Sequence, residues 1–385
     1  MYLDANATTP PADEVIDAMM PWLSGNFHNP SSSYGGGKIA RLAVDQARGQ
    51  VAELLGVSAE EIIFTGSGTE SVNTALCSWD RICGAGDFLA TMVEHSAVLR
   101  TGEAMKRCLS LCAVDPSGTL DWSDYADKLD RAAFVAVMAV NNETGVLMDW
   151  RRAAVLAHEK GLPFFTDAIQ AVGKIPLNMA DTACDALALS AHKFHGPKGV
   201  GALYLRRGTR FEPLLHGGGQ ESGRRSGTEN VAGIVGMGVA AALAQKRFTA
   251  GGLAGIAAMR DDFEARVLAG VSGVTRNGDL ASRLANTSHL SFEGCEAAGL
   301  LILLDEMGVA CSAGSACMAG KQQPSHVQKA MGFSDEQAKS SLRFSFSHRN
   351  GVDEWRQAAD CLIRAVGKLR SVQGGATGPV VVYSP

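Results

Sequence analysis

Hydrophobic residues along this chain of 385 residues follow two different spacings. Two stretches, Lys38 to Leu55 and Trp150 to Lys160, carry apolar residues three and four positions apart, which predicts helices. Short apolar runs between such stretches predict buried strands over residues 61–65, 134–140, 163–166, 186–189 and 201–205. Strands separated by helices predict a mainly parallel sheet covered on both faces. We therefore expect an α/β fold in which ligands gather at the carboxyl ends of the strands.

The same pattern suggests how the chain divides into domains. Residues 231–245 predict a long helix, and Gly251-Gly252 after it marks a boundary. We predict a large domain of residues 12–250 and a smaller α+β domain made of residues 1–11 and 251–372. Residues 373–385 contain several Gly and one Pro before a final apolar run. This segment is expected to be a linker-like tail that either adds an edge strand or is disordered.

Composition and charge narrow the class of protein. The 35 basic and 40 acidic residues give a net charge of -5, which argues against direct nucleic-acid binding. No apolar stretch of about 18 residues predicts a membrane span, and the first residues do not resemble a signal peptide. The nine cysteines are irregularly spaced without C-x-x-C pairs, which argues against a disulfide framework or a zinc site. These features predict a reduced, cytoplasmic enzyme without a metal.

Two charged residues at predicted strand ends suggest the chemistry. Lys193 follows the apolar run 186–189 and precedes a Gly-rich stretch. Asp167 directly follows the earlier apolar run 163–166. Such a pair suits a pyridoxal phosphate enzyme, because the amine forms a Schiff base and the carboxylate pairs with the protonated pyridine nitrogen. An Asp–Lys pair alone is weak evidence, because charged residues at strand ends are usually solvated or ion-paired.

A Gly-rich turn supplies a candidate phosphate site. The predicted strand 61–65 runs into Gly66-Ser-Gly68-Thr69, and a helical pattern follows. Amides at a helix N-terminus favour an anion, Gly68 permits close approach of the backbone, and the Thr69 hydroxyl can donate. The turn lacks both the Walker and the dinucleotide patterns. Standing alone it would be read as an ordinary capped turn; beside Lys193 the phosphate interpretation is preferred.

Taken in order, these segments and several others resemble cysteine desulfurases of the NifS/IscS type. The resemblance rests on residues 2–10, 29–32, 68–71, 93–98, 140–145, 167–170, 190–193, 225–230, 313–317, 324–327 and 341–346. That family belongs to the class V aminotransferase-like enzymes. The resemblance implies a fold-type I pyridoxal phosphate transferase, with a large domain built on a mainly parallel sheet and a smaller α+β domain.

The resemblance also implies roles for individual residues at the cofactor. Lys193 would hold pyridoxal 5'-phosphate, Asp167 would pair with its pyridine nitrogen, and His95 would stack on the ring and shuttle protons. The remaining cofactor contacts are assigned to Gln170 at the phenolic oxygen, to Asn142 near cofactor or substrate, and to Gly68, Thr69, Ser190 and His192 at the phosphate. Outside the resemblance, His95 would be read as a structural residue and Asn142 as a turn residue.

Three further residues carry implied roles in substrate binding, dimerisation and sulfur transfer. Arg343 would grip the substrate carboxylate, since its planar fork suits bidentate pairing; by pattern alone it is the solvent-side residue of a strand. Thr228 would reach the phosphate of a neighbouring subunit, which implies a homodimer. Cys317 would be the catalytic thiol, and its setting in Cys311-Ser-Ala-Gly-Ser-Ala-Cys317-Met-Ala-Gly320 predicts an accessible loop rather than a buried structural site.

The chain departs from many relatives at a few positions. Met318 stands where Thr is common, Cys311 is an extra thiol, and Tyr34 stands where His is common. Lys321-Gln-Gln replaces a segment that often reads Ser-Leu-Glu, and the tail is unlike that of housekeeping members. These differences leave the predicted chemistry intact, and they leave loop behaviour, thiol acidity and partner choice open.

The resulting hypothesis is a homodimer that converts L-cysteine to L-alanine and leaves a persulfide on Cys317. Its sulfur would pass to an iron–sulfur scaffold or another sulfur-carrier protein. The alternatives are a selenocysteine lyase, an aminotransferase without a sulfur role, and a sulfur-relay subunit that mainly docks a scaffold. The sequence leaves open the acceptor, the roles of Cys311 and the tail, and whether Cys317 also acts as a transient cluster ligand.

Overall fold

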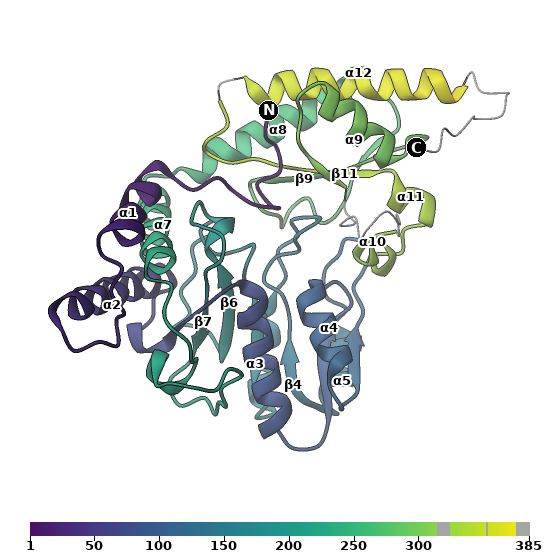
Figure 1. Cartoon of the computed structure of the whole chain (residues 1–385). Helices are drawn as coiled ribbons and strands as arrows, with labels where there is room; N and C mark the ends of the chain where they lie inside the picture. The colour runs from purple at the N-terminus through teal and green to yellow at the C-terminus, as the bar shows by residue number, and fades with distance from the viewer. Residues whose placement is uncertain (314–323, 352, 375–385) are drawn as a thin grey trace, which may run out of the picture.

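The computed structural model describes residues 1–313, 324–351 and 353–374. Figure 1 shows a seven-stranded sheet with its helices in the lower part of the molecule and a second sheet under helices in the upper part. The N-terminal segment enters the upper part before the chain turns down into α1. The expected α/β fold is confirmed.

The large sheet has the strand order β1-β7-β6-β5-β4-β2-β3. β7 alone runs against the other strands. Its first residue, Gly201, passes the Gly-rich turn so closely that a Cβ atom would lie 2.6 Å from the Ser67 carbonyl carbon. The strands are β1 Ile62–Thr65, β2 Asp87–Thr91, β3 Leu109–Cys112, β4 Ala132–Ala136, β5 Phe164–Asp167, β6 Ala186–Ser190 and β7 Gly201–Leu205.

Both faces of this sheet are buried, which explains the unbroken apolar runs of its strands. In β5, Phe164 packs with one cluster and Phe165 with the cluster on the other face. β4 starts two residues earlier than the predicted strand and ends at Ala136. Beyond it, Val137 and Ala139 still donate to Phe165 and Asp167, so the chain stays extended and buried without belonging to the strand.

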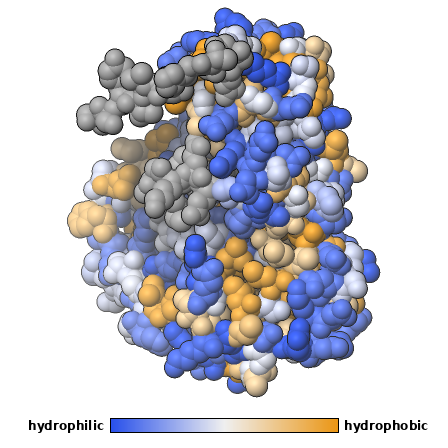
Figure 2. All heavy atoms as spheres, turned by 90° about the vertical axis from the view of Figure 1, so that its right-hand side faces the viewer, coloured by the Kyte–Doolittle hydropathy of each residue, from blue (hydrophilic) through white to orange (hydrophobic). Residues whose placement is uncertain are grey.

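Helices cover both faces of the large sheet. They are α1 Asp13–Ser24, α2 Gly35–Leu55, α3 Gly68–Ile82, α4 Ser96–Ala104, α5 Trp122–Leu129, α6 Trp150–Glu159 and α7 Val231–Thr249, with 3-10 turns η1 Ala59–Glu61, η2 Ala191–Lys193 and η3 Gln220–Gly223. Among the described residues, no helix combines the length and apolarity needed to cross a bilayer. The face at the right of Figure 1 carries small apolar groups among polar residues (Figure 2).

The upper part contains a four-stranded sheet of order β10-β11-β9-β8. Its strands are β8 Val274–Arg276, β9 Thr287–Phe292, β10 Ser312–Ala313 and β11 Ser341–Ser345, and its helices are α8 Leu253–Gly270, α9 Ala297–Glu306, α10 His326–Ala330, α11 Asp335–Lys339 and α12 Glu354–Gly374. A separate apolar cluster joins these elements and includes Leu3. The domain boundaries stay a prediction, and α12 extends two residues into the predicted tail.

Alternate residues of β9 and β11 point to two different environments. Leu290, Phe292, Leu342 and Phe344 belong to the apolar cluster under the helices. The other face of the same strands is polar and mostly buried, and it consists of Thr287, His289, Ser291, Ser341, Arg343 and Ser345. This polar face receives the N-terminal segment, because Asp4 bridges to Ser345 and the Asn6 amide donates to the Ser345 hydroxyl at 2.9 Å.

A buried ion pair gives a prediction about stability. Both oxygens of Glu264 on α8 accept from Arg283, at 2.6 and 2.8 Å, and the two side chains are 2% and 6% exposed. Glu264→Gln should lower the free energy of unfolding by about 3–5 kcal/mol, because it leaves the guanidinium buried without its counter-ion. Chemical denaturation measures this loss.

The matched control is Glu103→Gln, which removes a pair with Arg100 whose side chains are 52% and 69% exposed. It should change the unfolding free energy by less than about 1 kcal/mol. Equal losses of unfolding free energy in the two variants would show that burial does not make the Glu264 pair more important for stability than an exposed pair.

Candidate functional site

The candidate site lies where β5 and β6 end, beneath the N-terminal segment. Asp167 is the last residue of β5, and Ser190 is the last residue of β6. The 3-10 turn η2 follows directly and ends in Lys193. Neighbouring parallel strands end at one sheet edge, so the two predicted strand-end residues meet there, as the general rule for α/β sheets requires.

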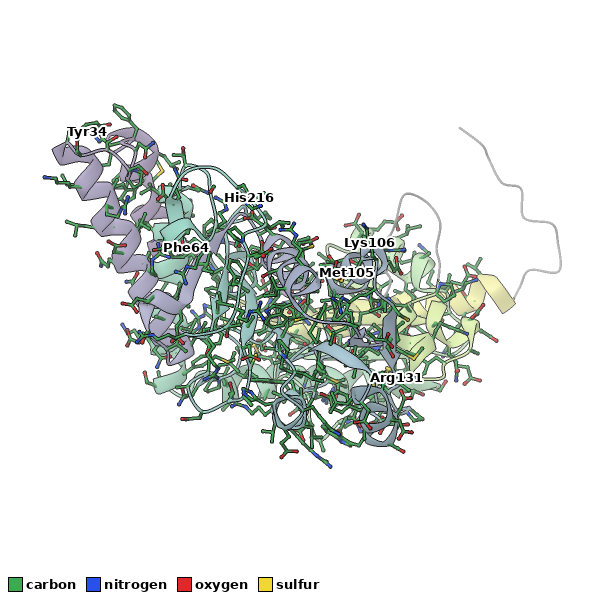
Figure 3. All side chains as sticks on the ribbon, turned by 90° about the horizontal axis from the view of Figure 1, so that it is seen from below. Tyr34, Phe64, Met105, Lys106, Arg131 and His216 are labelled. Atoms are coloured by element: carbon green, nitrogen blue, oxygen red, sulfur yellow. The ribbon has the colours of Figure 1, made fainter. Side chains whose placement is uncertain are left out.

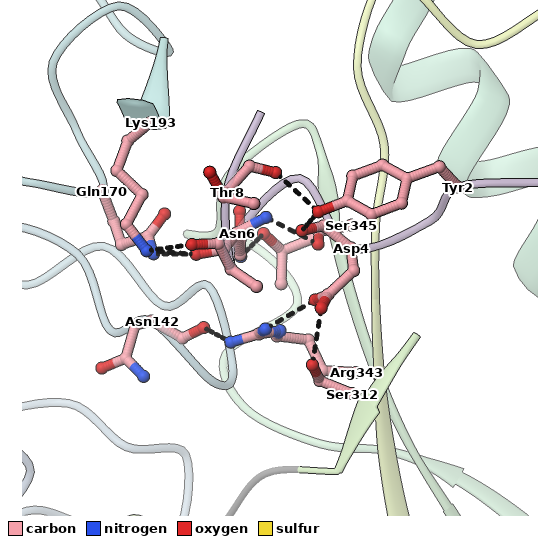
Figure 4. Close-up of polar contacts among 12 residues, drawn as sticks. Tyr2, Asp4, Asn6, Thr8, Asn142, Gln170, Lys193, Ser312, Arg343 and Ser345 are labelled. Carbon is pink, nitrogen blue, oxygen red and sulfur yellow. Dashed lines mark hydrogen bonds and ion pairs between the residues drawn. The ribbon is translucent and has the colours of Figure 1, made fainter. Parts of the chain in front are cut away.

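Lys193 is held by backbone carbonyls of the N-terminal segment. Its ammonium donates to the carbonyl of Asn6 at 2.6 Å and to that of Ala7 at 2.9 Å (Figure 4). Burial and the positive charge of Arg343 lower the pKa of Lys193 to about 8, against the opposing influence of Asp167 and Asp4. An amine with this pKa exchanges protons readily near neutral pH, as a base in catalysis must.

Asp167 and His95 face the same space as Lys193. Asp167 is 4% exposed, and its Oδ1 accepts from the Ile169 amide at 2.9 Å. Burial raises the pKa of Asp167, while His95 and Lys193 oppose that rise. His95 caps α4 and accepts at Nδ1 from the Ala97 amide at 3.1 Å, so a neutral ring carries its proton on Nε2. Burial lowers the pKa of His95, and the neutral ring is favoured.

Glu94, beside His95, is a buried acid that sequence reasoning did not single out. Its Oε1 accepts from the Met138 amide at 2.7 Å and from the Thr91 hydroxyl at 2.9 Å. Its Oε2 is buried without a hydrogen-bond partner among the described residues. Burial raises the pKa of Glu94 to about 8, so the group is mainly protonated at neutral pH and adds no second full charge next to Asp167.

Of the predicted phosphate residues, Gly68, Thr69 and Ser190 lie at the start of α3. Gly68 is its first residue, and a Cβ atom there would lie 2.4 Å from Ile169 Cδ1. Thr69 is exposed and shares with His95 an open cleft of about 500 Å³. His192 contacts the Thr8 hydroxyl through Nδ1 at 3.1 Å, and burial with nearby lysines lowers its pKa to about 4.

Gln170 lies four positions before Lys174, a residue that the sequence analysis left without a role. The Gln170 amide nitrogen donates to the Asn6 carbonyl at 2.8 Å, and its oxygen accepts from the Lys174 ammonium. Lys174 also donates to Asn6 Oδ1 at 2.8 Å. The carbonyl that accepts from Lys193 thus accepts from Gln170 as well (Figure 4).

Arg343 projects from β11 into the same region. Its Nη2 donates to Asp4 at 2.7 Å and its Nη1 donates to the Asn142 backbone carbonyl at 2.8 Å. Its Nε is buried and has no partner among the described residues. Asp4 also accepts from the Ser312 hydroxyl at 2.8 Å. The solvent-side position that the strand pattern alone would suggest for Arg343 is wrong, because that face packs on the N-terminal segment and the residue is buried.

The predicted residues Thr228 and Cys317 are not brought to Lys193 by the described contacts. Thr228 is exposed in the loop before α7. That loop is tied to the Gly-rich turn, because Arg225 donates to Glu70 at 2.8 Å and Glu70 accepts from the Gly66 amide at 2.7 Å. Cys317 lies outside the described residues.

Four residues of the site escaped the sequence analysis: Asp4, Asn6, Glu94 and Lys174. Asp4 and Asn6 lie in the segment 2–10 that carried the resemblance, and Glu94 lies next to His95. Lys174 stands four positions after Gln170, a spacing that would bring the two side chains together if the segment were helical, and they also meet in the irregular turn that the structure shows. That spacing was the available signal for Lys174, whereas the contacts of Asp4 and Asn6 depend on the tertiary fold.

Comparison with known proteins agrees with this geometry. The aminotransferase class-V family model matches residues 1–356. A cysteine desulfurase of Enterobacter agglomerans is 43% identical, covering 97% of this chain and 94% of the relative. The cysteine desulfurase NifS of Azotobacter vinelandii is 42% identical, with 99% and 96% covered. A solved structure described as a NifS-like protein superposes with a TM-score of 0.88 at 32% identity, covering 97% of this chain and 99% of that one. The chain therefore belongs to the cysteine desulfurases of the class-V aminotransferase family.

Proposed function

We propose that this chain binds pyridoxal 5'-phosphate and converts L-cysteine to L-alanine, with the sulfur transferred to Cys317 as a persulfide. The observation that carries the proposal is the convergence of Lys193, Asp167 and His95 at the ends of β5 and β6. The charge of Asp167 raises the pKa values of His95 and Lys193, and both of these groups lower the pKa of Asp167, as expected of side chains that share one buried space.

The donor set fits the cofactor. Asp167 offers a buried carboxylate for a pyridinium nitrogen, and the positive charge of that nitrogen would reverse the burial-induced rise in the Asp167 pKa. Gly68, Thr69 and Ser190 lie at the N-terminus of α3, which favours a phosphate group, and His192 is proposed to join them there. When bound, pyridoxal phosphate supplies an electron sink for the bond changes at the substrate Cα.

Lys193 is proposed to carry the cofactor and, once released by substrate, to move the proton of the substrate Cα. Its pKa of about 8 leaves a fraction of the amine unprotonated at neutral pH. The Asn6 and Ala7 carbonyls give this amine a resting position. His95, neutral and with Nε2 protonated, is proposed to stack on the ring and to serve as a second proton carrier.

Arg343 is proposed to bind the substrate carboxylate, with the Asn142 carboxamide near cofactor or substrate. The protein holds two of its nitrogens through Asp4 and Asn142, while Nε remains without a partner among the described residues. A carboxylate at the Nε edge would give this buried donor the acceptor that it lacks.

Cys317 is proposed as the nucleophile rather than Cys311. Cys311 is half-buried, and burial together with Asp4 raises its pKa to about 12. Thiols attack as thiolates, so Cys311 is a poor nucleophile at neutral pH. The assignment of Cys317 rests on the family resemblance, because this residue lies outside the described part of the chain.

A homodimer is proposed from an exposed apolar surface on α1, α2 and the residues between them. Its side chains are Ile16, Met20, Leu23, Phe27, Tyr34, Ile39 and Leu42. Figure 3 shows Tyr34 at the outer end of this apolar surface. Exposed patches of this kind are typical of protein interfaces. A second copy would also bring a Thr228 loop to the phosphate site.

The sulfur acceptor is proposed to be an iron–sulfur scaffold or a sulfur-carrier protein, and the compartment to be the cytoplasm. Selenocysteine lyase activity remains the second candidate, because Arg343 and the cofactor site would accept either amino acid. Comparing the turnover of L-cysteine and L-selenocysteine by the purified enzyme distinguishes the two.

Lys193→Ala should abolish the covalent cofactor linkage, because the variant lacks the amine at the end of η2. The purified wild type should be yellow, and after borohydride reduction the adduct should map to Lys193 by mass spectrometry. Lys198, exposed on the following turn, is the competing lysine. An adduct on Lys198 would overturn the assignment.

Arg343→Ala should raise the KM for L-cysteine, because a charge-assisted hydrogen bond is worth about 1.5–3 kcal/mol, or roughly tenfold to a hundredfold in affinity. Steady-state kinetics measure the change. The control is Arg225→Ala, since Arg225 is occupied by Glu70 and is the next candidate for the carboxylate. A raised KM in the control alone would move the carboxylate site to Arg225.

Cys317→Ser should eliminate both alanine formation and protein persulfide while leaving cofactor binding intact, because a hydroxyl cannot accept sulfur as a thiolate does. Cys311→Ser is the matched control and should leave both products largely unchanged. Alanine assays and persulfide mapping by mass spectrometry measure the two variants. If neither change affects the products, a desulfurase mechanism with a cysteine nucleophile is wrong.

A further inference from the structure

Lys174 is a partly buried lysine at the cofactor end of the site that the proposed mechanism does not use. Its ammonium donates to Gln170 Oε1 and to Asn6 Oδ1, the latter at 2.8 Å. Burial, Lys193 and Arg343 all lower its pKa well below the ordinary value. An amine kept in such a costly position, with both acceptors belonging to the site, suggests a role in the reaction.

The contacts of Lys174 fix which way the Gln170 carboxamide faces. The Lys174 amine donates to Gln170 Oε1 and to Asn6 Oδ1, so it favours the carboxamide orientation with Oε1 toward itself. The other end of the carboxamide, Nε2, then faces the Asn6 carbonyl and the Lys193 amine that shares it. The reverse orientation would place two donors together at Lys174 and two acceptors together at Asn6.

We propose that Lys174 is a positioning residue that acts through Gln170, keeping the N–H2 group of its carboxamide turned toward Lys193 and the cofactor. The inference rests on the proposed function. With the cofactor bound, Gln170 Nε2 can donate its hydrogen bond to an oxygen of the cofactor ring instead of to the Asn6 carbonyl. Lys174 then remains the donor that holds Oε1, and a carboxamide without it would rotate between two orientations.

The charged groups around Lys174 define what its removal changes. Lys193 and Arg343 repel it, Asp4 and Asp167 act on the neighbouring Lys193, and Asn6 is a neutral partner. Lys174→Met removes one positive charge and leaves Gln170 Oε1 without this donor, while Asn6 Oδ1 keeps a donor from Asn286 at 3.1 Å. Loss of the charge and loss of the donor must therefore be separated in the test.

The experiment is a double-mutant cycle on the holoenzyme with Lys174→Met, Gln170→Ala and the double variant. Lys174→Met should lower kcat for L-cysteine about tenfold with little change in KM, the size expected for an unsatisfied acceptor. In the Gln170→Ala background the same substitution should cost at least threefold less, because the group through which it acts is gone. Loss of the charge should raise the pKa of the visible absorption band in both backgrounds.

The control is Lys160→Met, which removes an exposed lysine paired with Asp130 and should match the wild type. Equal costs of Lys174→Met in the two backgrounds, or a Lys174→Met enzyme with wild-type kcat and titration, would overturn the inference. If the Met variant does not fold, Lys174→Gln enters the cycle under the same threefold criterion. A wild type that has no visible band would refute the proposed function itself, and this inference with it.

Discussion

One residue of the N-terminal segment, Asn6, links the small sheet to Lys193, Gln170 and Lys174 of the large domain. Its amide and side chain bond to Ser345 and Thr287 of the small sheet, and its carbonyl accepts from Lys193 and Gln170 of the large domain. Its Oδ1 accepts from Lys174 and from Asn286. Each polar atom is therefore used, which offsets the cost of burying an amide side chain that is 1% exposed.

This hub explains why two residues on the polar face of the small sheet, Thr287 and Ser345, are polar although they are buried. Thr287 and Ser345 are fully buried, yet they serve as partners of the Asn6 side chain and amide. Two apolar faces would also bind the domains together, but they could not orient a lysine and an arginine. Hydrogen bonds fix direction as well as distance, so the small sheet carries Arg343 to a defined place opposite Lys193.

Periodicity predicted the elements that present the site, because strands buried on both faces leave continuous apolar runs in the sequence. The strand ends Asp167 and Ser190 followed from those runs, and the resemblance then supplied roles. Asn6, Asp4 and Glu94 could not be found in this way, since their partners lie far away in the sequence or only become buried in the tertiary fold. The end of β4 was misjudged because residues 137–140 stay apolar and extended after leaving the strand.

The charges of the site favour anionic ligands. Lys174, Lys193 and Arg343 lie within reach of one another's fields, and Asp4 and Asp167 are the carboxylates that act on Lys193. Glu94 is largely protonated at neutral pH, so it adds little negative charge to offset these three positive groups. Mutual repulsion and burial therefore hold both lysine pKa values below their ordinary range. A bound phosphate or carboxylate would relieve that repulsion. The positive charges that lower the pKa values of the two lysines therefore also attract the phosphate of a cofactor and the carboxylate of an amino-acid substrate.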